Sequence, residues 1–339
     1  MKSLEEIQQI ERVVEDLDDY CRSEVICRVQ GEKFDFPVYK ISFGNPSPQA
    51  PVLGIVGGVH GLERIGAQVS VSLLQTFSKL ALWDQTTKDL LKEIRVFFIP
   101  TVNPYGLAFM RRSNHRGVDL MRNAPIEGDG KIPFLLGGHY HSPLLPWYRG
   151  RPEAMELEAQ ALCENVRQEI AASPCAITVD FHSGFGLRDR IWFPYANSTK
   201  VFEDIELVHS LVQLLENTYP HHFYQIEPQS MNYTTHGDLW DYIFQEHRKQ
   251  SSQVFVPLCV EMGSWNWVKK NPFQIFSSLG PFNPVKAHRM KRTLRRHNTF
   301  FDFLLKALRS PKVWSTLSEE QKFKHRQLAL GRWYKGTPP

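Results

Sequence analysis

The sequence predicts an α/β protein with a mixed, mainly parallel, twisted sheet covered by helices. Two observations indicate this fold. Apolar runs of strand length alternate along the chain with stretches whose apolar residues recur at helical spacing. Polar residues suited to catalysis directly follow three of these runs, and open α/β sheets place their sites at the carboxyl ends of their strands. The chain of 339 residues is long enough to bury a substantial core without disulfides.

The N-terminal part is expected to form a helix, a hairpin and a β-α-β unit. Residues 4–22 have helical spacing, whereas residues 24–43 alternate between apolar and polar side chains as an antiparallel hairpin does. A glycine-bounded apolar run at 52–56 predicts a buried strand. A helix over 66–83 and a second buried strand from Ile94 complete the unit.

The rest of the chain is expected to continue this alternation. A long loop rich in Gly, Pro, His and Tyr precedes two further strands, each ending at a residue suited to catalysis. The expected elements are a loop at 124–152, a helix at 153–171, a strand at 176–181 ending at His182, a helix at 204–218, a loop becoming helical within 234–245, and a strand at 254–261 ending at Glu261.

Composition limits the partners and the compartment. The net charge of +4 is too small to indicate nucleic acid, and no apolar stretch approaches the roughly 20 residues of a membrane span, so neither partner is expected. The basic stretch 286–296 is interpreted as the solvated face of a helix. Five cysteines without metal-finger spacing and an acid-rich N-terminus without a secretory signal favour a cytoplasmic protein. The oligomeric state is left open.

The domain organisation follows from the same patterns. We expect one catalytic domain over residues 1–310. Residues 311–339 are expected to form a basic C-terminal appendage, because their apolar side chains stand among basic and polar ones.

Three short motifs contain the residues expected to carry the chemistry. His60 and Glu63 stand in His-Gly-Leu-Glu, His182 in Asp-Phe-His-Ser-Gly, and Glu261 in Cys-Val-Glu-Met-Gly. Two imidazoles and a carboxylate, with the fourth position left to water, are the ligand set of a hydrolytic zinc site, whereas a structural site is closed, usually by cysteines. We therefore predict that His60, Glu63 and His182 bind one zinc ion beside a separate base.

Residues 50–265 resemble the zinc metallocarboxypeptidase family, which includes the pancreatic digestive carboxypeptidases and is related to the succinylglutamate desuccinylase and aspartoacylase branch. The resemblance implies a carboxypeptidase A-like sheet of about eight strands with a site at the strands' carboxyl ends. It also implies that the His-x-x-Glu pair, His60 and Glu63, and the later His182 are the zinc ligands. Asn103-Pro-Tyr-Gly matches the family's Asn-Pro-x-Gly turn.

The resemblance assigns two arginines. Arg112, in Arg-Ser-Asn, matches the arginine that stabilises the oxyanion, a role suited to a permanently charged guanidinium. Arg122, in Gly-Val-Asp-Leu-Met-Arg-Asn, matches the arginine that binds the substrate's terminal carboxylate. The family's assisting asparagine is replaced by Met121, whose thioether cannot donate that hydrogen bond. Strict selection of a free C-terminus is therefore in question.

Three further residues match substrate-binding or catalytic positions. Tyr233 corresponds to the tyrosine that closes over the substrate. Trp240 occupies the position that sets the side-chain preference, where an uncharged indole favours a small, apolar or aromatic group, although a tryptophan there could equally belong to the core. Glu261 matches the general base, which accepts a proton from water and delivers it to the leaving amine.

The predicted function is zinc-dependent hydrolysis of an amide bond, with removal of a C-terminal residue from a peptide as the first choice. Met121 leaves open a deacylase or amidase that acts on N-acylated amino acids. A catalytically inactive peptide-binding module is the third alternative, and the intact metal ligands and base argue against it.

Overall fold

The computed structural model describes residues 3–16, 21–184 and 186–334. Its strands are β1 (Cys21–Gly31), β2 (Phe34–Gly44), β3 (Val52–Gly57), β4 (Arg95–Ile99), β5 (Cys175–Gly184), β6 (Arg190–Phe193), β7 (Gln225–Pro228) and β8 (Val254–Gly263). Its α-helices are α1 (Glu5–Glu15), α2 (Arg64–Trp83), α3 (Gln85–Glu93), α4 (Pro104–Phe109), α5 (Leu157–Ile170), α6 (Ile205–Thr218), α7 (Leu239–Gln250), α8 (Trp265–Lys270), α9 (Ala287–Arg296), α10 (Asn298–Arg309) and α11 (Glu319–Trp333). Short 3-10 helices are η1 (Leu120–Arg122), η2 (Gln229–Met231), η3 (Pro272–Phe276) and η4 (Pro311–Val313).

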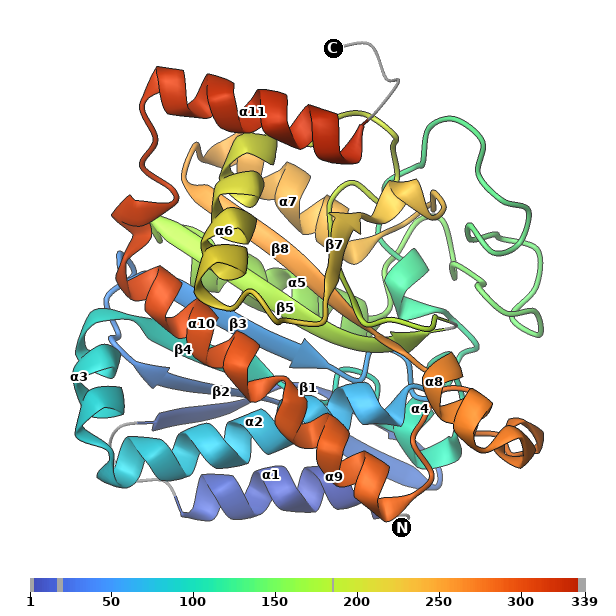
Figure 1. Ribbon diagram of the computed structural model, residues 1–339. Coiled ribbons are helices and arrows are strands. Elements are labelled where there is room, and N and C mark those ends of the chain that lie inside the picture. Colours follow the sequence, from blue (N-terminus) through green and yellow to red (C-terminus); the bar gives the residue numbers. More distant parts are fainter. Residues whose placement is uncertain (1–2, 17–20, 185, 335–339) are drawn as a thin grey trace.

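The described strands form an eight-stranded sheet in the order β1-β2-β4-β3-β5-β8-β6-β7. The central strands β4, β3, β5 and β8 run parallel, with antiparallel pairings to β2 on one side and β6 on the other. Helices cover both faces, with α2 and α10 in front of the sheet and α5 behind it in Figure 1. Every residue of β3 and β4 is buried, as expected for parallel strands covered on both faces. The predicted mixed, mainly parallel sheet is confirmed.

Most of the predicted elements are present. The hairpin expected at 24–43 is the pair β1 and β2, and the β-α-β unit is β3, α2 and β4. The strands expected to end at His182 and Glu261 are β5 and β8, and the two are direct neighbours. The loop expected at 124–152 contains no helix and only isolated bridges such as His139 with Tyr148.

Two predictions need correction. The helix expected over 4–22 ends at Glu15, and Cys21 already begins β1, because its backbone pairs with Phe43 across the hairpin. Strands β6 and β7 were not predicted. Each has only four residues, too few for a periodic pattern, and pairing with the long β8 holds β6 in the sheet.

The C-terminal residues lie against the body of the protein. Helix α11 packs on α6, where Arg332 forms an ion pair with Glu216 at 2.7 Å and the indole of Trp333 donates to the carbonyl of Ile226 at 2.7 Å. The expected division at residue 310 stays a prediction. The five cysteines are unpaired thiols. Within the described ranges, no helix has both the length and the apolar character to cross a membrane.

Candidate metal centre and active-site pocket

His60 and Glu63 are held in a turn between β3 and α2. Glu63 directly precedes α2, and its backbone N–H donates to the carbonyl of His60 at 3.1 Å. The side chain of Asn103 donates from Nδ2 to the carbonyl oxygens of Val59 and Arg112, both at 3.3 Å. The Asn-Pro-x-Gly turn noted in the sequence therefore fastens the His60 turn to the Arg112 loop.

Gly66 permits a close contact between α2 and the strand that carries His182. A Cβ atom at this position would lie 2.0 Å from the carbonyl oxygen of Phe181, so only glycine lets the first turn of α2 pack this tightly on β5. The same packing lets the backbone N–H of Ser183 donate to Oε2 of Glu63 at 3.1 Å. It brings Glu63 to His182 across 119 positions of sequence.

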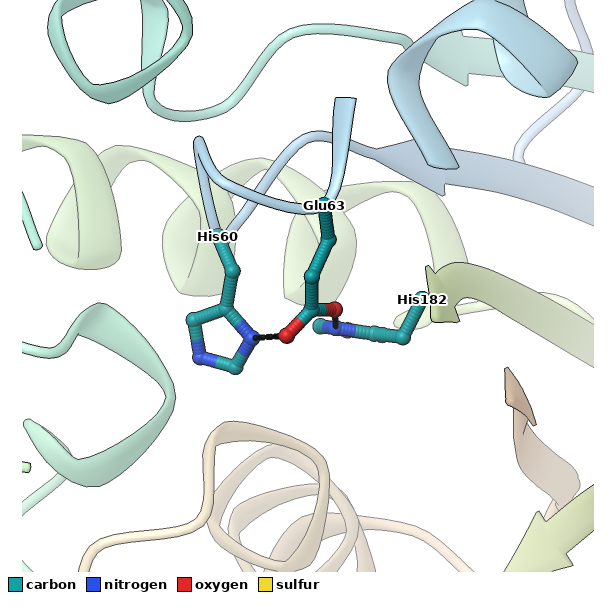
Figure 2. A group of neighbouring side chains, drawn as sticks. All are labelled: His60, Glu63 and His182. Atoms are coloured by element: carbon teal, nitrogen blue, oxygen red, sulfur yellow. Dashed lines mark hydrogen bonds and ion pairs between the residues drawn. The ribbon is translucent and has the colours of Figure 1, made fainter. Parts of the chain in front are cut away.

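Figure 2 shows the resulting cluster of His60, Glu63 and His182. Nδ1 of His60 lies 3.0 Å from Oε1 of Glu63, and Nδ1 of His182 lies 3.0 Å from Oε2. All three side chains are buried, and one ligand atom from each lies within 4.8 Å of the others. In the part of the chain that the structure describes, no other group of three such residues could hold a metal ion. The structure thus brings together the three ligands proposed from the sequence.

A second carboxylate lies behind each histidine. Nε2 of His60 is 2.9 Å from Oδ1 of Asp119, and Nε2 of His182 is 2.8 Å from Oδ2 of Asp180. A neutral imidazole has one N–H, so donating it to these carboxylates turns the Nδ1 lone pair towards the cluster centre. Carboxylates in this position orient metal-binding imidazoles and fix their tautomer. The donor set therefore fits a zinc ion.

The charges of the cluster also favour a cation at its centre. Burial disfavours charge on the imidazole of His182, yet Asp180 and Glu63 outweigh burial and raise the pKa of His182 well above its ordinary value. Burial is likewise outweighed at Glu63, whose pKa the two histidines hold well below its ordinary value. An imidazole with carboxylates at both nitrogens favours positive charge, and a divalent ion at Nδ1 supplies that charge in place of a proton.

Asp119 and Asp180 were not among the site residues predicted from the sequence. Asp119 stands inside the motif that contains Arg122. Asp180 precedes His182 by two residues on β5, and side chains two apart on a strand share a face. That spacing was the available signal for Asp180.

Arg112 contacts both Glu63 of the cluster and the carboxylate behind His60. Its Nε donates to Oδ2 of Asp119 and its Nη1 to Oε1 of Glu63, each at 2.9 Å. Burial opposes its charge, but Asp119 and Glu63 outweigh burial and raise the pKa of the guanidinium further. The side chain is 23% exposed and lines the cavity above the cluster. A fixed cation therefore faces the space next to the metal ligands.

Glu261 stands beside the cluster on the neighbouring strand, where the β5–β8 register pairs it with His182. Its Oε2 is buried and has no hydrogen-bond partner among the described residues. Gly184 leaves room for this oxygen, because a Cβ there would lie 2.9 Å from it. Burial, and then the nearby charge of Glu63, raise the pKa of Glu261 to about 7. Such a carboxyl group can exchange a proton near neutral pH.

A cavity of about 590 Å³ opens over the cluster. Its lining includes every residue assigned to the site from the sequence, namely His60, Glu63, Arg112, Arg122, His182, Tyr233, Trp240 and Glu261. It also includes Arg190 and Trp192 of β6, a strand that was not predicted. The predicted residues, drawn from six separate stretches of sequence, therefore face one space.

Arg122 and Tyr233 lie on one wall of this cavity. Arg122 is buried, and its Nε has no hydrogen-bond partner among the described residues. The Cζ atom of Arg122 lies 6.0 Å from the ring centroid of Tyr233, whose ring also meets Trp192 edge-on at 6.1 Å. Met121 is buried in the same wall and offers no hydrogen-bond donor. A buried guanidinium nitrogen without a partner favours an anionic ligand.

Trp240 has two connections within the site. Its side chain lines the cavity, as predicted from the sequence for a residue that contacts the substrate. It is also 95% buried, and its Nε1 donates to Oδ2 of Asp180 at 3.0 Å. Trp240 therefore contacts both the pocket and the carboxylate behind His182.

Comparison with known proteins agrees with this geometry. The family model described as zinc carboxypeptidase, peptidase M14, matches residues 31–268, so the chain belongs to the zinc carboxypeptidase family. That membership supports a peptide-cleaving hydrolase. A curated relative, the inactive metallocarboxypeptidase ECM14 of Ajellomyces capsulatus, is 27% identical over 186 residues. The match covers 48% of this chain but only 28% of that relative's length.

Solved structures show the same fold. Bovine thrombin-activatable fibrinolysis inhibitor, solved in complex with a tick carboxypeptidase inhibitor, superposes with a TM-score of 0.65 and 20% identity, covering 90% of this chain and 96% of that one. Carboxypeptidase A from Helicoverpa armigera superposes with a TM-score of 0.55 and 16% identity, covering 74% of this chain and 62% of the other. At these identities the likeness concerns the fold.

Proposed function

We propose that the protein is a zinc-dependent hydrolase that removes the C-terminal residue of a peptide. The observation that carries this proposal is the guanidinium of Arg122, which lines the same cavity as the His60, Glu63 and His182 cluster and whose Nε has no hydrogen-bond partner among the described residues. A substrate carboxylate would neutralise that guanidinium while the preceding amide bond lies near the cluster. Family membership supports the same class of reaction.

The roles of the residues follow from their positions. Zinc, when bound by His60, Glu63 and His182, supplies a Lewis acid that polarises a carbonyl and lowers the pKa of water. Glu261 accepts the proton of the attacking water and returns it to the leaving amine. Arg112, a fixed donor beside the cluster, stabilises negative charge on the former carbonyl oxygen.

Substrate orientation is assigned to the cavity wall. Arg122 binds the terminal carboxylate through charge-assisted hydrogen bonds, and Tyr233 packs beside it. The indole of Trp240 presents an uncharged surface, which favours a small, apolar or aromatic substrate side chain.

A specific observation keeps a second function open. Met121 lines the cavity where the family resemblance implies an amide donor, so only Arg122 would bind a terminal carboxylate on that wall. A deacylase or amidase that acts on N-acylated amino acids needs no such donor. The inactive relative raises a third alternative, a peptide-binding module, but this chain retains all three metal ligands, Arg112 and Glu261.

The test is a mass-spectrometric hydrolysis screen of the zinc-loaded protein. Matched peptides with free or amidated C-termini are compared with N-acyl amino acids, using chelator-treated protein and His182→Ala as controls. Chelator-sensitive loss of one residue from free-acid peptides alone is the expected result. Cleavage of acyl amino acids, or indifference to amidation, would indicate the deacylase or amidase. Zinc binding without turnover across the panel would indicate the inactive module.

A further inference from the structure

Residues 262–301, here called the acid-free segment, have an unusual charge distribution. They contain four lysines and four arginines but no aspartate or glutamate. The whole chain, by contrast, balances 40 basic residues with 36 acidic ones. The charge of this segment, +8, therefore exceeds the net charge of the whole chain, +4, and the rest of the chain carries a net charge of −4.

The segment exposes aromatic side chains next to its lysines. After α8 ends at Lys270, the short helix η3 presents Phe273 and Phe276, which are 82% and 86% exposed, and the partly exposed Ile275. Lys269 and Lys270 are also exposed. Figure 1 shows α8 and the turn after it extending outward from the body of the protein. An exposed apolar cluster of this kind indicates a contact with something outside the chain.

Most lysines and arginines of the segment are not neutralised by a carboxylate. Arg296 forms an ion pair with Asp189 at 3.3 Å, whereas the other lysines and arginines of the segment form no ion pair with a described carboxylate. Arg289 on α9 donates to the carbonyl oxygens of Trp267 and Lys270, which places the start of α9 beside the end of α8. The positive charge of α9 and that of α8 therefore lie on adjoining elements next to the exposed phenylalanines.

The segment is anchored at the rim of the active-site cavity. Asn283 donates to the carbonyl of Leu62 at 2.7 Å and accepts from the backbone of Ile65 at 2.8 Å, on either side of the metal ligand Glu63. Phe282 lines the cavity, and its carbonyl accepts from the hydroxyl of Ser183 at 2.8 Å. The segment that carries the exposed side chains therefore also contributes to the wall of the cavity.

We propose that the acid-free segment docks the protein on an anionic lipid bilayer, with Phe273, Ile275 and Phe276 inserted at the boundary between headgroups and acyl chains. Exposed aromatic and aliphatic side chains flanked by lysine and arginine are the composition of an interfacial membrane contact. Basic residues alone would suit a nucleic acid equally well, but its phosphate backbone offers nothing to Ile275. A contact at the bilayer surface needs no spanning helix, so this proposal departs from the expectation of no membrane partner, which rested on the lack of a spanning segment. This inference goes beyond the proposed function. Lipid binding is measured without substrate hydrolysis, so its outcome does not depend on whether the protein is a carboxypeptidase.

The experiment is co-sedimentation of the full chain with vesicles of phosphatidylcholine alone or mixed with phosphatidylglycerol. Binding is expected only to the anionic vesicles. It should weaken between about 0.1 M and about 1 M salt, because the Debye screening length falls to roughly 3 Å at the higher concentration. Replacing both Phe273→Ser and Phe276→Ser should weaken binding at least about tenfold, because each side chain loses apolar contact. Replacing Lys269→Gln and Lys270→Gln should remove much of the preference for anionic lipid.

A matched control is Trp83→Ser. This tryptophan is 71% exposed at the far end of the 20-residue helix α2, roughly 30 Å from the metal ligands, so vesicle binding should be unchanged. Each variant's folding is checked by its thermal unfolding midpoint. Equal binding by wild type and the double phenylalanine variant would overturn the proposal. So would tighter binding to a single-stranded oligonucleotide that competes with vesicles, which would point to nucleic acid.

Discussion

The indole nitrogen of Trp240 and the metal ligand His182 share one oxygen of Asp180. Trp240 Nε1 donates to Oδ2 of Asp180 at 3.0 Å, and Nε2 of His182 lies 2.8 Å from the same atom. Asp180 is fully buried, and its other oxygen has no partner among the described residues. The residue at the position expected to contact the substrate therefore also holds the carboxylate that orients His182.

Trp240→Phe is expected to weaken zinc binding about tenfold or more. The variant removes the hydrogen-bond donor that fixes Asp180, and loss of a partner that orients a metal ligand usually lowers metal affinity by at least about tenfold. A chelator competition titration measures the zinc dissociation constant. Trp192→Phe is the matched control, since it removes another indole from the cavity without touching Asp180. If both variants bind zinc equally, the hydrogen bond to Asp180 has no role in holding the metal.

Glu261→Gln is expected to retain zinc and lower kcat by about a hundredfold to ten-thousandfold, the usual contribution of general acid–base catalysis. Metal analysis and steady-state kinetics check the two parts separately. Turnover needs the carboxylate form, so kcat/KM should rise with pH through the pKa of Glu261. That pKa is about 7 without metal, and a bound cation lowers it, so this limb is expected below pH 7 in the zinc enzyme. A near-normal rate for Glu261→Gln would remove it from the mechanism.

Arg122→Ala is expected to reduce kcat/KM for free-acid peptides by about a hundredfold, because a charge-assisted contact to the terminal carboxylate is lost. Amidated peptides, which lack that charge, should be affected little. Met121→Asn supplies the missing amide donor and should raise kcat/KM for free-acid peptides relative to amidated ones. The measurement is the ratio of kcat/KM for a matched pair of peptides, and an unchanged ratio in both variants would take this wall out of carboxylate recognition.

Gly66→Ala is expected to lower the free energy of unfolding by about 2 kcal/mol or more, because the added methyl group meets the backbone of β5 rather than a movable side chain. Since this contact brings Glu63 to His182, zinc affinity should fall as well. Gly331→Ala in α11 is the control: nothing lies within 4 Å of its Cβ position, and alanine should stabilise the helix by about 1 kcal/mol or less. Urea unfolding of both variants tests the pair.

The contact between α6 and α11 is expected to weaken at acid pH. Nδ1 of His209 lies 2.9 Å from Nδ1 of His325, and burial, then the proximity of His325, lower the pKa of His209 from 6.5 to about 4. The unfolded chain therefore takes up this proton first, so stability should fall as pH drops from 6.5 towards 4 and should not depend on this group above that range.

Thermal unfolding across that pH range is the measurement. The double variant His209→Gln and His325→Gln should show a flatter pH dependence than the wild type, whereas exposed His288→Gln should not. A profile in the double variant as steep as that of the wild type would show that other groups cause the acid destabilisation.

The sequence predicted most of the central sheet because its strands are long, mostly apolar runs, and the run at 52–56 is also bounded by glycines. It did not predict β6 and β7, whose four-residue spans carry no period and depend on pairing with β8 for their place. The helix expected to continue to residue 22 likewise gave way to pairing with Phe43, since a hairpin ladder outweighs local helical spacing.

By itself the sequence determined the set of chemical groups: His60 and Glu63 in one turn, and His182 and Glu261 at strand ends. Because parallel strands share a carboxyl edge, these groups had to emerge on the same side of the sheet. Only the tertiary structure decided their distances, since the approach of α2 to β5 at Gly66 depends on close packing between elements distant in sequence. Only the tertiary structure joined Trp240 to Asp180 and placed the acid-free segment beside the cavity, because hydrogen bonds between elements distant in sequence produce no periodic pattern in the sequence.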